Sequence, residues 1–178
     1  NIANNTWYTD VSAVPLAISY GGSMVFDHQQ YIYVLRGNSS DNFWRYNTFL
    51  DVWESLDKAD FGAPQTNINN NAYMGASLAI DIGNGLIYAT QGNYSNAFSV
   101  YNINTNQWTL LGELPALPYL GASLAYYPTT DSIIFQPGNG FPNMYSYSVS
   151  NKGWTQLQSA PSGFNHGAGL YPIGKYMY

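Results

Sequence analysis

The side chains of this sequence that could catalyse a reaction or bind a metal are few and scattered. It has two histidines, His28 and His166, which lie far apart in the chain. A metal site in a protein usually gathers three or four ligands, so two isolated histidines do not predict one. His166 could serve as a ligand or a base at the mouth of a channel, but we favour a polar residue satisfied at a strand end. We therefore expect no metal and no cofactor.

Carboxylates could work together as a general acid and base if two of them faced each other. Four lie close together in the chain, at Asp51, Glu54, Asp57 and Asp60. Glu54 directly follows Trp53 and is expected to face solvent, so we interpret the group as a solvated acidic rim. The sequence also lacks a glycine-rich phosphate loop and a nucleophile elbow. It predicts no catalytic residue and favours a protein that is not an enzyme.

The composition argues against several classes of function. Only 8% of the 178 residues are charged, the formal net charge is −5, and there are five basic residues. Lysine and arginine neutralise the phosphates in nucleic-acid complexes, so we expect no nucleic-acid binding. No apolar run approaches the roughly 18 residues of a membrane span. The lack of cysteine excludes disulfides, thiolate metal sites and cysteine nucleophiles.

An internal repeat organises the chain and supplies the elements that must position any site. Tryptophan recurs with spacings of 46, 55 and 46 residues. In three copies the glycine of a Gly-Asn pair lies nine residues before a tyrosine, which lies seven residues before the tryptophan. A further glycine opens an apolar stretch in every copy. The markers are Trp7, Trp53, Trp108 and Trp154; Gly22, Gly75, Gly121 and Gly167; Gly37, Gly92 and Gly138; and Tyr46, Tyr101 and Tyr147.

Each repeat is predicted to form four short strands, called a to d. Short runs of apolar and aromatic residues are separated by turn residues. Four strands in about 50 residues, with a periodic Gly and Trp, are typical of a β-propeller blade. Small residues in strand a would let blades meet at a central channel, and broad rings in strands c and d would fill the wider space outside. The expected strands are 22–26, 31–35, 43–46 and 52–56; 75–79, 86–89, 98–101 and 107–111; and 121–125, 132–135, 144–147 and 153–157.

The repeat resembles a known family. The run 31–38, followed by 43–47 and Trp53, resembles the kelch repeat, although the first Gly of the family's Gly-Gly doublet is replaced in each copy. The resemblance covers almost the whole chain and implies an all-β fold: a kelch-type β-propeller with four-stranded antiparallel blades, present as a partial ring. We expect strand d of a preceding blade at 1–18, blades at 19–57, 73–112 and 119–158, and strands a and b of an incomplete blade at 164–178.

Kelch propellers generally have more blades than this, so the resemblance implies a missing remainder. We favour a fragment of a longer protein. Alternatively, the chain associates with another copy, or closes alone as a small four-bladed ring that lacks one strand c. An isolated arc would expose apolar blade faces and unpaired strand edges.

The best candidates for a binding site lie in loops. The b–c and d–a connections of a propeller share one face, and here they carry aromatic rings beside asparagine amides. Flat apolar area with paired donors and acceptors suits a protein or glycan partner. The long connection from about 57 to 72 is equally consistent with an ordinary surface insertion. The candidate binding residues are Phe61, Asn69, Asn70, Tyr94 and Phe141.

Three Asn-X-Ser/Thr sequons begin at Asn4, Asn38 and Asn93 and are candidate glycosylation sites. They favour an extracellular or cell-surface location, although a chain this rich in Asn and Ser also forms such triplets by chance. Asn38 and Asn93 stand at equivalent positions, so glycans there would shield part of the candidate binding face.

Three functions are consistent with these patterns. We favour a noncatalytic extracellular propeller that binds protein or glycan partners. The second is an oxidase-like or carbohydrate-active enzyme whose active site lies in other blades. Kelch propellers of the galactose-oxidase type use copper with a cysteine-crosslinked tyrosine, which this segment cannot form because it has no cysteine. The third is a structural subunit of a surface layer or filament.

Overall fold

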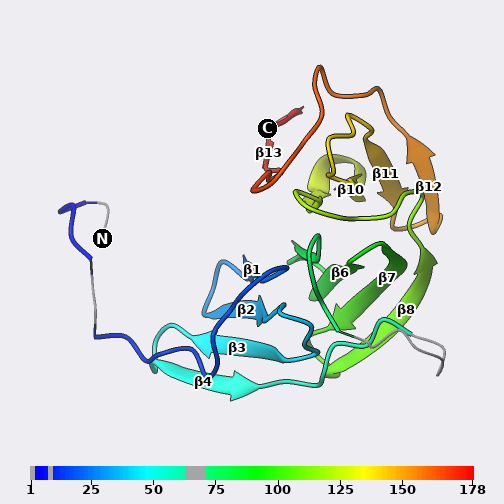
Figure 1. Cartoon of the computed structure of the whole chain (residues 1–178). Coiled ribbons are helices and arrows are strands. Elements are labelled where there is room, and N and C mark those ends of the chain that lie inside the picture. The colour runs from blue at the N-terminus through cyan, green and yellow to red at the C-terminus, as the bar shows by residue number, and fades with distance from the viewer. Residues whose placement is uncertain (1–2, 8–9, 63–70) are drawn as a thin grey trace.

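The protein is an arc of β-sheets. The computed structural model describes residues 3–7, 10–62 and 71–178, and there the chain forms three four-stranded antiparallel sheets and one two-stranded sheet (Figure 1). In each four-stranded sheet the consecutive strands pair as a meander. The sheets follow one another around an arc that does not close. The all-β partial propeller expected from the sequence is therefore confirmed.

The strand bounds agree closely with the predicted strands. Blade 1 consists of β1 (Ser23–Phe26), β2 (Tyr31–Leu35), β3 (Phe43–Asn47) and β4 (Val52–Ser55). Blade 2 consists of β5 (Ser77–Asp81), β6 (Leu86–Gly92), β7 (Ser95–Asn102) and β8 (Gln107–Glu113). Blade 3 consists of β9 (Ser123–Tyr127), the 3₁₀ turn η1 (Pro128–Thr130), β10 (Ser132–Gln136), β11 (Tyr145–Ser148) and β12 (Gly153–Gln156). Blade 4 has only β13 (Pro172–Ile173) and β14 (Tyr176–Met177).

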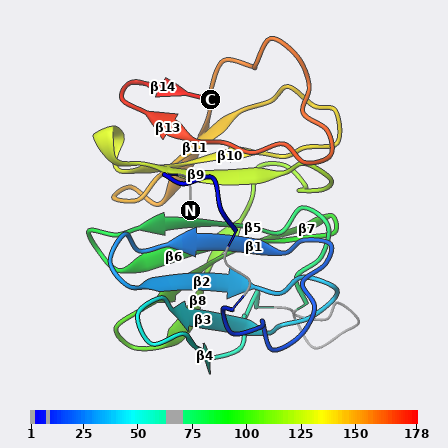
Figure 2. The same cartoon turned by 90° about the vertical axis from the view of Figure 1, so that its left-hand side faces the viewer.

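The blades stack side by side with their first strands innermost. Strands β1, β5 and β9 contact one another in order, and β13 contacts β9. Figure 2 shows the arc from its open side, with blade 1 below and blade 4 above. Each blade therefore has one face toward its predecessor and one toward its successor.

Aromatic rings fill the widening space between blades. Between blades 1 and 2, Phe43 lies edge-on to Tyr101, with ring centroids 4.9 Å apart, and 5.1 Å from Trp108. Between blades 2 and 3, Phe98 repeats both contacts, 5.0 Å from Tyr147 and 5.1 Å from Trp154. Because the same positions meet in both interfaces, the prediction that broad rings fill the outer space is confirmed.

A series of serines joins the inner strands. Leu78 N–H donates to Ser23 Oγ at 3.0 Å, and Leu124 N–H donates to Ser77 Oγ at 3.0 Å. Leu170 N–H donates to the hydroxyl of Ser123 at 3.1 Å. An inner strand is an edge strand whose outward N–H groups lack a ladder partner. The preceding blade supplies that partner. At the corresponding position of blade 4 the residue is Gly169, which has no hydroxyl.

Tryptophan and the turn before it join the outer strands. The indole N–H of Trp53 donates to the carbonyl of Ser12 at 3.0 Å, and that of Trp108 donates to the carbonyl of Asp57 at 3.2 Å. The N–H groups of the same two residues donate to the turns, Ser12 to Asp51 Oδ1 at 2.7 Å and Asp57 to Asn106 Oδ1 at 3.0 Å. Blade 2 thus holds the exit segment of blade 1, and blade 1 holds the N-terminal segment in the same way.

The repeat begins one residue earlier in blade 1 than the sequence suggested. The marker Gly22 was aligned with Gly75, but the equivalent residue is Gly21, which shares its positive φ (78° and 88°). A Cβ on Gly21 would lie 1.9 Å from the carbonyl oxygen of Tyr73, and one on Gly75 would lie 2.5 Å from that of Tyr119. Glycine is therefore required where each blade meets the start of the next.

The two ends differ from the expected strands. Residues 3–7 and 10–22 form no strand, so strand d of a preceding blade is not formed there, and Trp7 is 95% exposed. The stretch 167–171, expected as strand a of the last blade, is also not a strand; pairing begins at β13. Both segments lack the neighbouring strands that hold the complete blades together.

Candidate loop-face site

Two of the predicted binding residues line one hollow. It has a volume of about 430 Å³ and lies between the b–c loops of blades 2 and 3 and the connection that joins these blades. This volume lies within the range of small-ligand pockets. The lining residues are Tyr94, Ala116, Leu117, Pro137, Asn139, Phe141 and Asn143. The prediction that b–c and d–a connections share a face is confirmed by this contact.

Tyr94 is held firmly in an unusual conformation. Three consecutive residues, Gly92, Asn93 and Tyr94, have positive φ angles of 78°, 53° and 59°. A bulky residue with positive φ is an outlier that costs about 1–3 kcal/mol unless its surroundings hold it. Here the Tyr94 N–H donates to the carbonyl of Pro118 at 3.0 Å, and its ring stacks on Tyr119 with centroids 4.2 Å apart. The ring remains 50% exposed at the edge of the hollow.

Phe141 lies on the other side of the hollow, in a loop that is fixed in a similar way. Gly140 N–H donates to the carbonyl of Phe164 at 2.7 Å, and the Phe141 N–H donates to Gly138 at 3.0 Å. From below, the fully buried Gln136 donates its Nε2–H to the carbonyl of Phe141 at 3.3 Å. The ring of Phe141 is 53% exposed. The two rings are therefore presented by loops that are already ordered.

The other predicted binding residues do not join this hollow. The prediction that Phe61 is a binding residue is wrong. Phe61 is only 1% exposed, and its ring centroid lies 6.0 Å from that of Trp108, so it belongs to the core between blades 1 and 2. The alternation of buried Ala59 and Phe61 after β4 was the signal for this, because strand-like spacing places both on the core side. Asn69 and Asn70 lie outside the described residues.

All three sequon asparagines are exposed, so Asn4, Asn38 and Asn93 remain predicted glycosylation sites. Asn38 and Asn93 have nearly equal φ angles, 56° and 53°, in equivalent loops. The hydroxyl of Ser95, in the third sequon, donates to Gln91 Oε1 at 2.6 Å. Asn93 precedes Tyr94, so a glycan there would lie beside the hollow.

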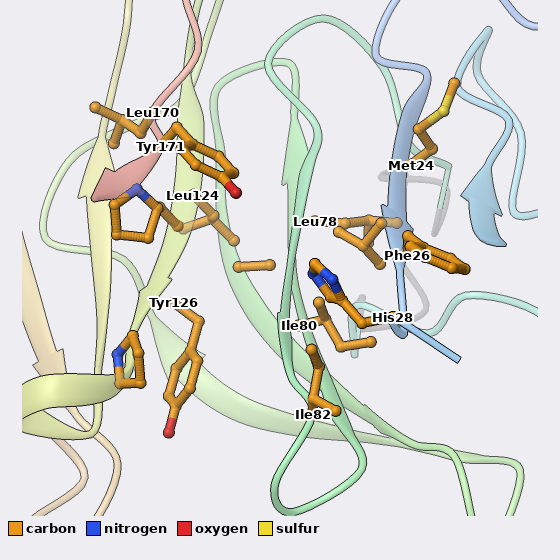
Figure 3. A pocket seen from close by; sticks show the side chains of 15 residues that line it. Met24, Phe26, His28, Leu78, Ile80, Ile82, Leu124, Tyr126, Leu170 and Tyr171 are labelled. Carbon is orange, nitrogen blue, oxygen red and sulfur yellow. The ribbon is translucent and has the colours of Figure 1, made fainter. Parts of the chain in front are cut away.

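A second, larger hollow of about 520 Å³ lies along the inner strands (Figure 3). Tyr126 brings its hydroxyl to this region and donates to Asp131 Oδ1 at 3.1 Å; burial and this hydrogen bond raise the pKa of Tyr126. His28 lines the same hollow beside Phe26, with ring centroids 5.4 Å apart. The labelled lining side chains are Met24, Phe26, His28, Leu78, Ile80, Ile82, Leu124, Tyr126, Leu170 and Tyr171.

The histidines and carboxylates do not form a reactive group. His166 lines a separate hollow of about 350 Å³ at the other end of the inner strands, among the marker glycines. Over residues 3–7, 10–62 and 71–178, no three His, Asp or Glu side chains gather as a metal site would require. In the same part of the chain, no helix could cross a membrane.

The acidic residues near β4 make structural contacts. Glu54 forms an ion pair with Arg45 at 2.6 Å, across the pair of strands β3 and β4. Asp51 accepts hydrogen bonds from the Tyr46 hydroxyl at 2.5 Å and from Ser12, and these bonds lower the pKa of Asp51. Neither carboxylate faces another across a cleft, as a general acid and base would.

Comparisons with known proteins agree with the architecture. No family model matches the chain. The Kelch-like protein terF of Aspergillus terreus is 25% identical over 174 residues, which cover 86% of this chain and 36% of that protein. The structure of YjhT superposes with a TM-score of 0.68 at 14% identity, over 94% of this chain and 59% of YjhT. A chain of the nidogen/laminin complex superposes with a TM-score of 0.61 at 14% identity, over 84% of this chain and 51% of that one. The chain thus spans well under two thirds of each relative, and the kelch-type resemblance is confirmed.

Proposed function

We propose that this kelch-type propeller segment is a noncatalytic module that binds a protein or glycan partner through its loop face. The observation that carries the proposal is the hollow between Tyr94 and Phe141, whose rings are half exposed although their backbones are fixed. Exposed rings on ordered loops contribute contact area with little loss of conformational freedom on binding. A binding scaffold needs this combination, and the blades behind the loops supply the rigid support.

The carboxylates support a binding role over a catalytic one. A catalytic role for this segment itself would need a free acid–base pair, but Glu54 is paired with Arg45, and Asp51 accepts hydrogen bonds from Tyr46 and Ser12. These side chains lie around the outer strands of blade 1 and do not line the hollow between blades 2 and 3. Their contacts account for them as parts of the fold.

We also propose an extracellular or cell-surface location. The exposed sequon asparagines Asn4, Asn38 and Asn93 support it, because their side chains are accessible to modification. Intact mass of the protein from its native source would test this point. Sugar on at least one of the three would support the location, and an unmodified mass would remove its main argument.

A structural subunit is the second candidate, and exposed apolar residues favour it. Trp7 is 95% exposed, and Met24 and Tyr171, which line the hollow along the inner strands, are each 64% exposed. Neighbouring subunits could cover these residues in an assembly. Analytical ultracentrifugation over a range of concentrations would separate this candidate, because an assembling subunit forms larger species as concentration rises.

The binding proposal can be tested by comparing variants on a panel of printed glycans and purified cell-surface proteins. The combined change Tyr94→Ala and Phe141→Ala should abolish binding to any member that the unchanged protein binds. Phe49→Ala is the matched control, because Phe49 is 75% exposed but lies in the turn between β3 and β4, on the opposite face. Equal binding by the double variant would reject the hollow as the site.

A further inference from the structure

We propose that the loop-face hollow takes an uncharged sugar unit, lying between the rings of Tyr94 and Phe141 with its hydroxyls toward Asn139 and Asn143. The inference rests on the proposed function, since it names the ligand of the same hollow. It follows from three properties of the lining: its lack of charge, its aromatic rings, and the hydrogen-bonding groups that remain available there.

The first property is that none of the seven lining residues is charged. An ionised ligand would lose water on entering the hollow and meet no counterion, which is unfavourable. The ion pairs of Arg45 with Glu54 and of Lys58 with Asp41 belong to blade 1 or its exit segment. The hollow between blades 2 and 3 therefore favours a neutral ligand.

The second property is the pair of half-exposed aromatic residues, one from the b–c loop of each blade. Tyr94 has one ring face against Tyr119, with an interplanar angle of 15°, so that ring is kept in one orientation. The face of an aromatic ring carries negative charge density and attracts weakly positive C–H groups. One side of a pyranose ring is such a C–H surface, while its edge carries hydroxyls. A flat ring with an apolar face and a polar edge matches this geometry.

The third property separates a sugar from a peptide. A peptide that binds by adding a β-strand needs free main-chain donors and acceptors of the protein. The loop N–H groups here already donate within the protein: Tyr94 to Pro118, Asn139 to Leu120 at 2.8 Å, and Gly140 to Phe164. What remains is the side-chain amides of Asn139 and Asn143, each with two donors and one acceptor oxygen. A hydroxyl is both a donor and an acceptor and pairs with such an amide on either side.

The test uses unglycosylated protein, so that no sugar on Asn93 competes. Calorimetric titrations would use maltotriose, cellotriose and diacetylchitobiose as neutral probes, polygalacturonate as an acidic probe and a proline-rich peptide as the peptide probe. We expect saturable binding of at least one neutral probe and none of the acidic one. Tyr94→Ala and Phe141→Ala should each weaken binding by about 2- to 10-fold. Tyr94→Phe keeps the ring and should retain binding, and Phe49→Ala should leave it unchanged.

Each result decides the question. The sugar assignment is wrong if no neutral probe binds. It is also wrong if a neutral probe binds Tyr94→Ala and Phe141→Ala as tightly as it binds the unchanged protein and the folded Tyr94→Phe variant. If only the proline-rich peptide binds, and the alanine variants of Tyr94 and Phe141 lose that binding, the assignment of a sugar ligand is wrong. The loop face is then still a binding surface. Failure of all these probes and of the whole glycan and protein panel would overturn the proposed function as well.

Discussion

Removing one hydroxyl from the serine series should weaken the junction between two blades. In Ser77→Ala the N–H of Leu124 loses its acceptor, the Ser77 Oγ at 3.0 Å. Both residues are buried, with 8% and 4% of their surface exposed, so water cannot easily replace the lost bond. A buried N–H without a partner costs about 1–3 kcal/mol, and we expect the free energy of unfolding to fall by that amount.

The chain offers a matched control in the same blade. Ser99 is completely buried, and its Oγ has no hydrogen-bond partner. Ser99→Ala makes the same chemical change but removes a hydroxyl that gains nothing in the folded state. The free energy of unfolding should therefore stay unchanged or rise by up to about 1 kcal/mol. The difference between the two variants isolates the hydrogen bond from the general effect of replacing serine.

Equilibrium unfolding in urea would measure both. For a slope of about 2 kcal/mol/M, a loss of about 2 kcal/mol moves the midpoint down by about 1 M. The slope itself should match that of the unchanged protein, because neither variant alters the surface exposed on unfolding. A Ser99→Ala variant that is as unstable as Ser77→Ala would refute the reasoning, and so would a Ser77→Ala variant with an unchanged midpoint.

Three further predictions follow from the repeat. Lys152 has a positive φ of 53° where blades 1 and 2 have Asp51 and Asn106, and lysine cannot accept a bond from Tyr147. Lys152→Asn should therefore raise the free energy of unfolding by about 1 kcal/mol in urea titrations, and no gain would argue against the equivalence of the turns. Gly75→Ala, whose Cβ would lie 2.5 Å from the Tyr119 oxygen, should lower the melting temperature more than Gly167→Ala, which has a positive φ but nothing within 4 Å. Equal losses would show that φ alone matters. Burial raises the pKa of Tyr101 to about 12, so the folded state keeps this phenol neutral while the unfolded chain ionises it above pH 10. Stability from this group is complete below pH 10 and is lost as the pH rises toward 12; urea midpoints measured across that range should fall, and less steeply in Tyr101→Phe.

The strands could be predicted because the information is local. Short apolar and aromatic runs bounded by turn residues, such as 31–35 opposite 43–47, indicate a strand from a few neighbouring positions. The marker glycine of blade 1 could not be fixed in this way, because Gly21 and Gly22 are adjacent and either continues the pattern. What distinguishes them is the approach of Tyr73, more than fifty residues later. The predictions of the two terminal strands were wrong for the same reason, because strand pairing depends on neighbouring strands as well as on the strand's own residues.

The candidate site was predictable in its parts but not as a whole. The sequence placed Tyr94 and Phe141 in equivalent loops of successive blades, which follows from the repeat. It could not show that one hollow joins them, because that depends on how closely blades 2 and 3 pack. The prediction for Phe61 was wrong because a long connection is ordinarily exposed. The first part of this connection instead continues along the blade, where Trp108 packs against Phe61.

The serine series gives the arc a direction. At three junctions the serine hydroxyl of one blade accepts a hydrogen bond from the N–H of a leucine in the next blade, so the acceptor always lies on the N-terminal side. A hydrogen bond stabilises both of its partners, so the loss of either blade at such a junction removes the same contact from its neighbour. Gly169 stands at the serine position of blade 4 and has no hydroxyl, so this blade offers no such acceptor and the series ends at Leu170.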